Sequence, residues 1–266
     1  MTPTITVITV CRNALTLLKP TVESVLAQDC PGLEYWIVDG ASTDGTREYL
    51  AELAARGVRV ISEPDRGIAD AMKKGVGLSA GDWIAHLHAG DTYLRGALRA
   101  VLERLEAPGD TPFDVLCGNI VKQEGTGEVL YRCEPSRLRM DMTIHHPATF
   151  TRRSVFVEIG GFDESYPNAM DYDFFLRVFV SGKRFATVPR ALARMAGGGQ
   201  SERSLWTTYR ETHAIRRRAL PSGYERSYTH FLFLITRGAA RRLLQRVGLE
   251  RLVAWYRRRF SMVPKG

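Results

Sequence analysis

The sequence has no long apolar run. No stretch reaches the roughly 18 apolar residues of a membrane-spanning helix, and the most apolar candidate, residues 228–236, is far too short. Residues 1–10 lack the basic and small-residue features of a secretory signal peptide, and their β-branched pattern predicts a strand instead. These absences predict a cytoplasmic protein that does not span the membrane.

Cysteine is scarce, and its four residues are scattered along the chain. None lies in a Cys-x-x-Cys pair and no histidine cluster has zinc spacing, which argues against a structural zinc site. Scattered thiols without an export signal are typical of a reducing compartment. We expect all four to pack as small apolar side chains: Cys11, Cys30, Cys117 and Cys133.

The common phosphate-binding loops are also missing. No Gly-x-x-x-x-Gly-Lys-Ser/Thr motif is present. Residues 75–80 match Gly-x-Gly-x-x-Ala, but they follow a predicted helix and precede a predicted strand, the reverse of the order in a dinucleotide-binding unit. We therefore interpret these glycines as the end of a helix.

Charge is distributed unevenly in a chain whose apolar and charged fractions, 44% and 25%, are ordinary for a globular protein. The net charge is +8, yet residues 203–266 alone hold 15 Lys and Arg residues against 3 Asp and Glu residues. Residues 1–202 are therefore net acidic and would repel a nucleic acid. The pattern predicts a globular body, residues 1–202, followed by a basic helical arm, residues 203–266.

Strand and helix patterns alternate through the first half of the chain, which predicts a mostly parallel sheet with helices on both faces. The predicted strands are residues 5–10, 33–38, 58–62, 83–87, 113–121, 129–132 and 184–188. The predicted helices cover residues 18–26, 46–56, 68–78, 94–105 and 170–180.

Polar clusters follow four of the predicted strands, at residues 9–13, 39–44, 63–66 and 88–91. In an open α/β sheet, ligands bind beyond the carboxyl ends of the strands. We therefore expect these four clusters to meet at one edge of the sheet and to form the binding site.

Three aspartates are candidates for chemistry. Asp91 follows a strand, where it either holds a divalent cation against a diphosphate or caps the next helix. Asp171 and Asp173 begin a predicted helix, where the helix dipole favours acids. Asp173 is spaced i, i+4 from Arg177, which predicts a surface ion pair, so Asp171 is the more promising catalytic acid.

The order of these motifs resembles that of a known family. The segments that carry the resemblance are residues 7–13, 24–28, 37–46, 63–72, 81–82, 89–91, 146–150, 160–164 and 171–173. Together, over residues 4–201, they resemble the family 2 glycosyltransferases with the GT-A fold, of the bacterial polysaccharide-assembly kind. No single motif is specific, but the ordered set is.

The resemblance implies a fold and a reaction. The fold would be a Rossmann-like GT-A α/β domain, with a nucleotide-binding half at about residues 1–110 and an acceptor half at about residues 111–202. The reaction would be inverting transfer of a sugar from a nucleotide-sugar, with UDP as the expected nucleotide, to a hydroxyl of a saccharide or lipid-linked saccharide. Mn²⁺ or Mg²⁺ would bind the diphosphate.

The resemblance also assigns residues to roles. Asp171 would be the general base, Asp91 the metal ligand, His146 an acceptor contact, and Ser201 part of a loop near the donor phosphates. The nucleotide would contact Thr9, Cys11, Asp39, Asp65, Arg66, Asp70, His88 and Ala89. His88 departs from the Asp or Asn usual at its position, and it would either ligate the metal or contact the ribose.

The basic arm has two interpretations that the sequence does not separate. Residues 231–260 mix apolar side chains with arginines, a pattern typical of a helix on an anionic membrane, with Trp255 and Tyr256 at the headgroups. The same pattern is expected of a helix packed on the catalytic domain or on a second subunit of a homo-oligomer.

Other functions remain as alternatives. A nucleotidyltransferase would carry a glycine-rich loop near the first strand, where this chain has Cys11-Arg12-Asn13. A nucleic-acid-binding role would rest on the arm alone. A catalytically inactive homologue that serves as a nucleotide-binding or assembly subunit is the strongest alternative, although Asp39, Asp91 and Asp171 are all present.

Overall fold

The structure is a computed structural model of the chain. It describes residues 3–107, 112–124, 127–197 and 204–220, with seven further positions between 236 and 249. Within these ranges no helix combines the length and apolarity needed to cross a bilayer.

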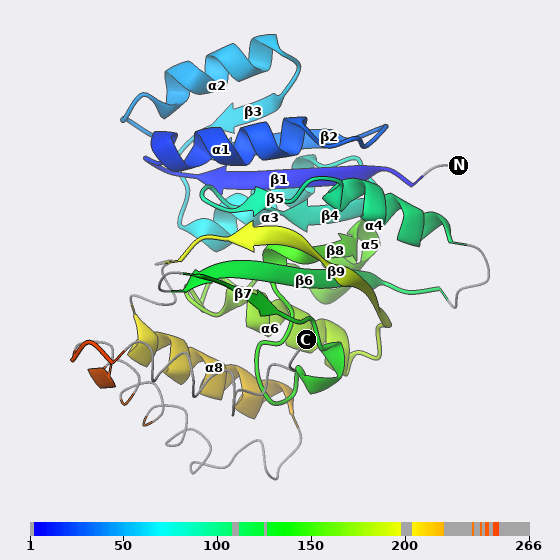
Figure 1. Cartoon of the computed structure of the whole chain (residues 1–266), viewed down its shortest axis with the longest axis vertical. Helices are drawn as coiled ribbons and strands as arrows, with labels where there is room; N and C mark the ends of the chain where they lie inside the picture. Colours follow the sequence, from blue (N-terminus) through cyan, green and yellow to red (C-terminus); the bar gives the residue numbers. More distant parts are fainter. Residues whose placement is uncertain are drawn as a thin grey trace.

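The core of the fold is a nine-stranded sheet (Figure 1). Its first four strands in space, ordered β3-β2-β1-β4, all run parallel. They are β1 (Ile5–Cys11), β2 (Glu34–Asp39), β3 (Arg59–Ser62) and β4 (Trp83–His86). Their carboxyl ends meet at one edge, as the alternating pattern predicts.

The second half of the sheet is mixed rather than parallel. β8 pairs antiparallel with both β4 and β6, β9 runs parallel to β6, and β5 and β7 add antiparallel pairs. These strands are β5 (Thr92–Tyr93), β6 (Val115–Glu124), β7 (Gly127–Tyr131), β8 (Thr149–Arg152) and β9 (Phe185–Met195). The mostly parallel sheet expected from sequence is thus confined to strands β1–β4, in the N-terminal half of the chain.

Helices cover both faces of the sheet, and an apolar cluster lies between the sheet and the helices on each face. One face packs against α1 (Leu15–Leu26), α2 (Thr46–Ala55) and α4 (Ala97–Glu106). The other packs against α3 (Ile68–Leu78), α5 (Arg153–Ile159) and α6 (Met170–Val180). Single-turn 3-10 helices, Pro135–Arg137 and His146–Ala148, lie in the connections before β8.

The central strand β1 is buried at every position. Its side chains alternate between the two clusters, with Val7 and Cys11 in one and Ile8 and Val10 in the other. Because a parallel strand is covered on both faces, its sequence is mostly apolar instead of alternating, and its two threonines form hydrogen bonds with side chains of β2.

Helix α3 packs closely on β1 through a glycine. A Cβ atom at Gly75 would lie 2.5 Å from Cγ2 of Ile8, whereas one at Gly77 would meet no atom within 4 Å. Both glycines lie inside α3, which ends at Leu78. The interpretation of this glycine pair as a helix end instead of a dinucleotide loop is confirmed.

Helix α8 (Leu205–Ala219) is the described start of the basic arm, and it contacts α6 (Figure 1). Ile215 and Leu220 are buried in the same apolar cluster as α6. This part of the arm therefore packs on the body. The amphipathic pattern at residues 231–260, with Trp255 and Tyr256, falls almost entirely outside the described residues.

Candidate active site

Asp39 ends β2 at the edge where the parallel strands terminate, and its side chain is fully buried. One carboxylate oxygen accepts hydrogen bonds from the Ser42 amide at 3.0 Å and the Ser62 hydroxyl at 2.7 Å. The other accepts from the Ser42 hydroxyl and lies 3.7 Å from the sulfur of Cys11. Asp39 thus joins β1, β2, β3 and the following loop at the sheet edge.

Cys11 and Thr9 lie next to this carboxylate network on β1. Burial, followed by the charge of Asp39, raises the pKa of Cys11 well above its ordinary value, so the thiol stays protonated. Thr9 is also fully buried, and its hydroxyl lies 3.0 Å from that of Tyr35 on β2. In this structure both side chains support the strands, and their contact with a nucleotide stays a prediction.

A polar loop closes over the end of β1. Asn13 has a positive φ of 47°, its amide donates to the Ser42 hydroxyl at 2.7 Å, and its side-chain oxygen accepts from the Thr43 amide at 2.8 Å. Asp44 accepts from the first amides of two helices, Leu15 of α1 and Thr46 of α2, both at 3.1 Å. These bonds fix the loop that the sequence predicts to face the ligand.

Asp65 lies against the backbone of this edge. A Cβ at Gly40 would be 2.3 Å from Oδ2 of Asp65, so any larger residue after Asp39 would require the Asp65 side chain to move. The other Asp65 oxygen accepts from the Gly67 amide at 2.9 Å. The Asp39-Gly40 turn and the loop at residues 63–67 are therefore in direct contact.

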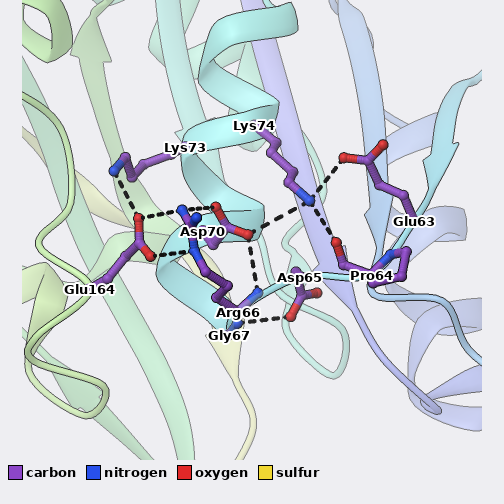
Figure 2. A network of polar contacts seen from close by, with 9 residues as sticks. All are labelled: Glu63, Pro64, Asp65, Arg66, Gly67, Asp70, Lys73, Lys74 and Glu164. Atoms are coloured by element: carbon purple, nitrogen blue, oxygen red, sulfur yellow. Dashed lines mark hydrogen bonds and ion pairs between the residues drawn. The ribbon is translucent and has the colours of Figure 1, made fainter.

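Arg66 connects this loop to the second half of the molecule (Figure 2). Its guanidinium makes ion pairs with Asp70 at 2.9 Å and with Glu164 at 3.0 Å. Glu164 also pairs with Lys73 at 2.9 Å, and Lys74 pairs with Glu63 on the other side of α3 at 2.8 Å (Figure 2). Sequence reasoning missed Glu164 as a partner because it lies almost one hundred positions away along the chain.

The centre of the site is His146, which lies between two aspartates. Nε2 of His146 is 3.4 Å from Oδ2 of Asp91, and Nδ1 is 3.6 Å from Oδ2 of Asp171. Asp91 follows β4, His146 precedes β8, and Asp171 lies in the first turn of α6. The structure thus brings together three residues whose roles the family resemblance implies.

The imidazole of His146 is held as a cation. Burial disfavours its charge, but the hydrogen bonds and charges of Asp171 and Asp91 outweigh that effect and raise the pKa of His146 to about 9. Burial likewise acts against ionised Asp171, yet His146 and the Tyr172 amide keep the pKa of Asp171 below its ordinary value. Asp171 is therefore an ionised carboxylate at neutral pH, as a general base must be.

The ring of His88 packs against that of His146 in a tilted arrangement, with ring centroids 4.4 Å apart and 38° between the ring planes. Burial, followed by the charge of His146, lowers the pKa of His88 to about 3, so this second imidazole is neutral. Its Nε2 atom is buried and has no hydrogen-bond partner. Ala89, the next residue, is half-buried at the same edge.

The side chains near Asp91 offer few metal ligands, which suits a cation that is bound mainly by phosphate oxygens and water. The described residues contain no group of three side chains able to hold a metal ion by themselves. Asp91 offers one carboxylate, although Oδ1 already accepts from the Ala196 amide at 2.8 Å. Nε2 of the neutral His88 is buried without a hydrogen-bond partner and can add a nitrogen ligand, whereas the cationic His146 cannot serve as one. Mg²⁺ and Mn²⁺ commonly bind through one or two carboxylates plus phosphate oxygens and water, which this set fits.

The predicted ion pair between Asp173 and Arg177 is confirmed, but its predicted position at the surface is wrong. Asp173 is 1% exposed, and its carboxylate is bound both by Arg177, at 2.8 Å, and by Arg218 of α8, at 2.6 Å. Arg218 of α8 packs against the pair from a position 45 residues away, so no local pattern predicts that Asp173 is buried. Ser201, expected near the donor phosphates, lies outside the described residues.

Comparison with known proteins shows which sequences resemble this chain. Residues 6–173 match the family described as glycosyl transferase family 2. A relative named PGL/p-HBAD biosynthesis glycosyltransferase, from Mycobacterium bovis, is 29% identical over 180 residues, which cover 66% of this chain and 70% of that protein.

Two solved structures share the fold. Mannosyltransferase PcManGT from Pyrobaculum calidifontis, in complex with GDP-Man and Mn²⁺, has a TM-score of 0.67 at 18% identity over 99% of this chain and 84% of its own. S. aureus TarS 1–349, in complex with UDP, has a TM-score of 0.60 at 16% identity over 80% of this chain. The chain spans 64% of that TarS fragment, less than two thirds of its length.

Proposed function

Because the chain belongs to glycosyl transferase family 2, we propose that it transfers a sugar from a nucleotide-sugar donor to an acceptor hydroxyl with inversion of the anomeric centre. The observation that carries this proposal is the contact of one imidazole, His146, with both Asp91 and Asp171. Asp91, which is suited to the donor diphosphate, and Asp171, which is suited to the acceptor hydroxyl, therefore lie next to the same side chain.

Asp171 is the proposed general base. A sugar hydroxyl is a weak nucleophile at neutral pH, and a positioned carboxylate that accepts its proton contributes on the order of 10²–10⁴-fold to the rate. The side chain of Asp171 is 28% exposed and ionised, so an acceptor can approach it. A single base on the face opposite the leaving group supports direct displacement and hence inversion.

Asp91 is the proposed ligand of a divalent cation, Mn²⁺ or Mg²⁺, at the donor diphosphate. Such a cation would offset the negative charge that develops on the leaving nucleoside diphosphate. His88 and His146 would line the same volume. The neutral His88, whose Nε2 is buried without a hydrogen-bond partner, can bind the cation or a ligand, whereas the cationic His146 can only donate hydrogen bonds.

The nucleotide is proposed to bind at the edge built by Asp39, Asp65 and Arg66, with Asp70 and the β1 residues behind them. We propose UDP as the nucleotide, and the TarS fragment, which was solved with UDP, supports testing it first. PcManGT was solved with GDP-Man and Mn²⁺, so GDP-sugars belong in the same test.

The acceptor is proposed to be a saccharide or lipid-linked saccharide in cell-surface polysaccharide or glycolipid assembly. The name of the Mycobacterium bovis relative supports a biosynthetic role of this kind. We further propose that the enzyme acts at the cytoplasmic face of the membrane, because the basic residues 203–266 would attract it to anionic lipids.

Nucleotide binding by the full chain is the first test. Thermal unfolding is measured with UDP, GDP, CDP and dTDP, each with and without Mn²⁺, because a ligand that binds only the folded state raises its stability. We expect one nucleotide to raise the midpoint in a Mn²⁺-dependent way, and the matching sugar donor then enters a transfer assay with NMR detection of the product anomer. Folded protein that binds none of the four would contradict the proposal and favour an assembly subunit without catalysis.

A further inference from the structure

The amino end of α6 receives a cap from a distant helix. Its N-cap residue, Ala169, provides no side-chain cap. The amides of Asn168 and Ala169 instead donate to one carboxylate oxygen of Glu211 on α8, both at 2.9 Å. Glu211 is 9% exposed, so this carboxylate is buried against the start of α6.

A second polar contact joins the same two helices. Nη2 of Arg218 on α8 lies 2.6 Å from Oδ1 of Asp173, and Nη1 lies 3.0 Å from Oδ2 of Asp163 in the preceding turn. Glu211 and Arg218 are separated by about two helical turns and so lie on one face of α8. That face contacts the first turn of α6 at two points.

Asp171 lies between these two points. Residues 168 and 169, just before it, are bonded to Glu211, and Asp173, just after it, is bonded to Arg218. The first turn of a helix has amides without intrahelical partners and therefore depends on external acceptors to stay ordered. Holding this turn from both sides fixes the backbone from which the Asp171 side chain extends.

Packing alone does not require these charges. Ile215 and Leu220 already bury apolar surface between α8 and the body. Burying a carboxylate and a guanidinium costs desolvation free energy, and apolar residues of similar size often dock helices at least as well. Charged groups at these positions are better explained by the precise geometry that hydrogen bonds impose.

We propose that Glu211 and Arg218 are positioning residues, which hold the first turn of α6 so that Asp171 points at the acceptor hydroxyl. The inference rests on the proposed role of Asp171 as the base. On this proposal, α8, the first helix of the basic arm, contributes to the active site by positioning Asp171.

The test is a double-mutant cycle in the full chain. Glu211→Ala and Glu211→Gln are each made in the native background and in Asp171→Asn. Single-turnover release of nucleoside diphosphate is measured from UDP-GlcNAc and from GDP-mannose, and the donor that turns over is used throughout. Glu52→Ala is the matched control, because Glu52 is an exposed helical glutamate on α2, far from α6.

We expect Glu211→Ala to lower the single-turnover rate by roughly 10- to 100-fold, the loss typical of a misplaced catalytic group, with the donor concentration for half-maximal rate changed by less than about twofold. Glu211→Gln should recover most of the rate, because its amide oxygen still accepts from the Asn168 and Ala169 amides. In Asp171→Asn, Glu211→Ala should cause no further loss, because residues that act as a unit are not additive.

Two results would overturn the inference: an unchanged rate in Glu211→Ala, or an equal loss in both backgrounds, which indicates general destabilisation. A fully active Asp171→Asn would instead contradict the proposed role of Asp171 as the base. The failure of the proposed function is thereby distinguished from the failure of this inference. If Glu211→Ala does not fold, Arg218→Lys is used in the same cycle, because lysine keeps the charge but cannot contact Asp163 and Asp173 together as a fork. The same pattern of coupled loss is expected there, and additive loss contradicts the proposal.

Discussion

Nδ1 of His146 lies 3.6 Å from Oδ2 of Asp171, while the opposite nitrogen of the same ring faces Asp91. A single imidazolium thus occupies the space between the two acids and offsets part of their negative charge. Its attraction to each carboxylate compensates for the repulsion between them.

This pairing predicts a pH dependence of stability in metal-free protein. The pKa of His146 is raised from an ordinary 6.5 to about 9, so its stabilising contribution is fully present below pH 6.5 and is lost as the pH rises through about 9. The contribution is on the order of 3 kcal/mol. The free energy of unfolding is measured by urea at pH 6 and pH 9.5 with a chelator present. The difference between the native protein and His146→Gln should be large at pH 6 and much smaller at pH 9.5. Parallel pH profiles of the two proteins would contradict this pairing.

Removing the charge of Asp171 should abolish transfer without loss of donor binding. Asp171→Asn cannot accept the proton of the hydroxyl, so we expect kcat to fall by about 10²–10⁴-fold. The Mn²⁺-dependent thermal shift with the nucleotide should remain, because Asp171 is assigned to the acceptor side. A variant that transfers sugar at the native rate would show that another group is the base.

Asp91→Asn separates metal binding from folding. The amide keeps an oxygen for the Ala196 N–H but removes the charge that would hold a cation. A nucleotide at about 100 times its Kd stabilises a protein by about 2.7 kcal/mol, and the Mn²⁺-dependent part of this gain should disappear. Asp29→Asn is the matched control, because Asp29 is an exposed aspartate in the loop after α1. This variant should keep the full Mn²⁺-dependent stabilisation. An unchanged Mn²⁺ dependence in Asp91→Asn would assign the metal elsewhere.

Two glycines of α3 should respond oppositely to alanine. Gly75→Ala forces a methyl group against Ile8 and should destabilise the protein by about 1–3 kcal/mol. Gly77→Ala meets open space and should stabilise it by about 0.5–1 kcal/mol, because alanine favours the helix. Urea unfolding of both variants checks the contrast, and equal effects would disprove the close approach of α3 to β1.

The sequence predicts the N-terminal half well because its signals are local. The bounds of the helix at residues 68–78 agree with the structure, and so do those of one helix in the second half, residues 170–180. The polar clusters after β1, β2 and β4 do lie at strand ends, because βα units place them there by topology.

The second half was less predictable because its elements depend on distant partners. β8 is only four residues long and follows a proline-containing turn, so no alternating pattern distinguishes it from a loop. β9 extends to Met195 because it pairs along β6, a partner about seventy positions away in sequence. The contacts of Glu164, Glu211 and Arg218 are likewise tertiary, so each residue taken alone resembles an ordinary surface charge.

The pairing of β8 with β4 determines how the site can vary. His146 stands just before β8, and Phe150 is in register with Ala85 on β4, which leads to Asp91. A single inserted residue within β8 would move the following chain by about 3.3 Å and reverse its facing. Insertions at residues 135–145, in the connection before β8, leave that register untouched. This connection can therefore vary in length and sequence while a hydrogen-bonded ladder keeps β8 in place beside the strand that leads to Asp91.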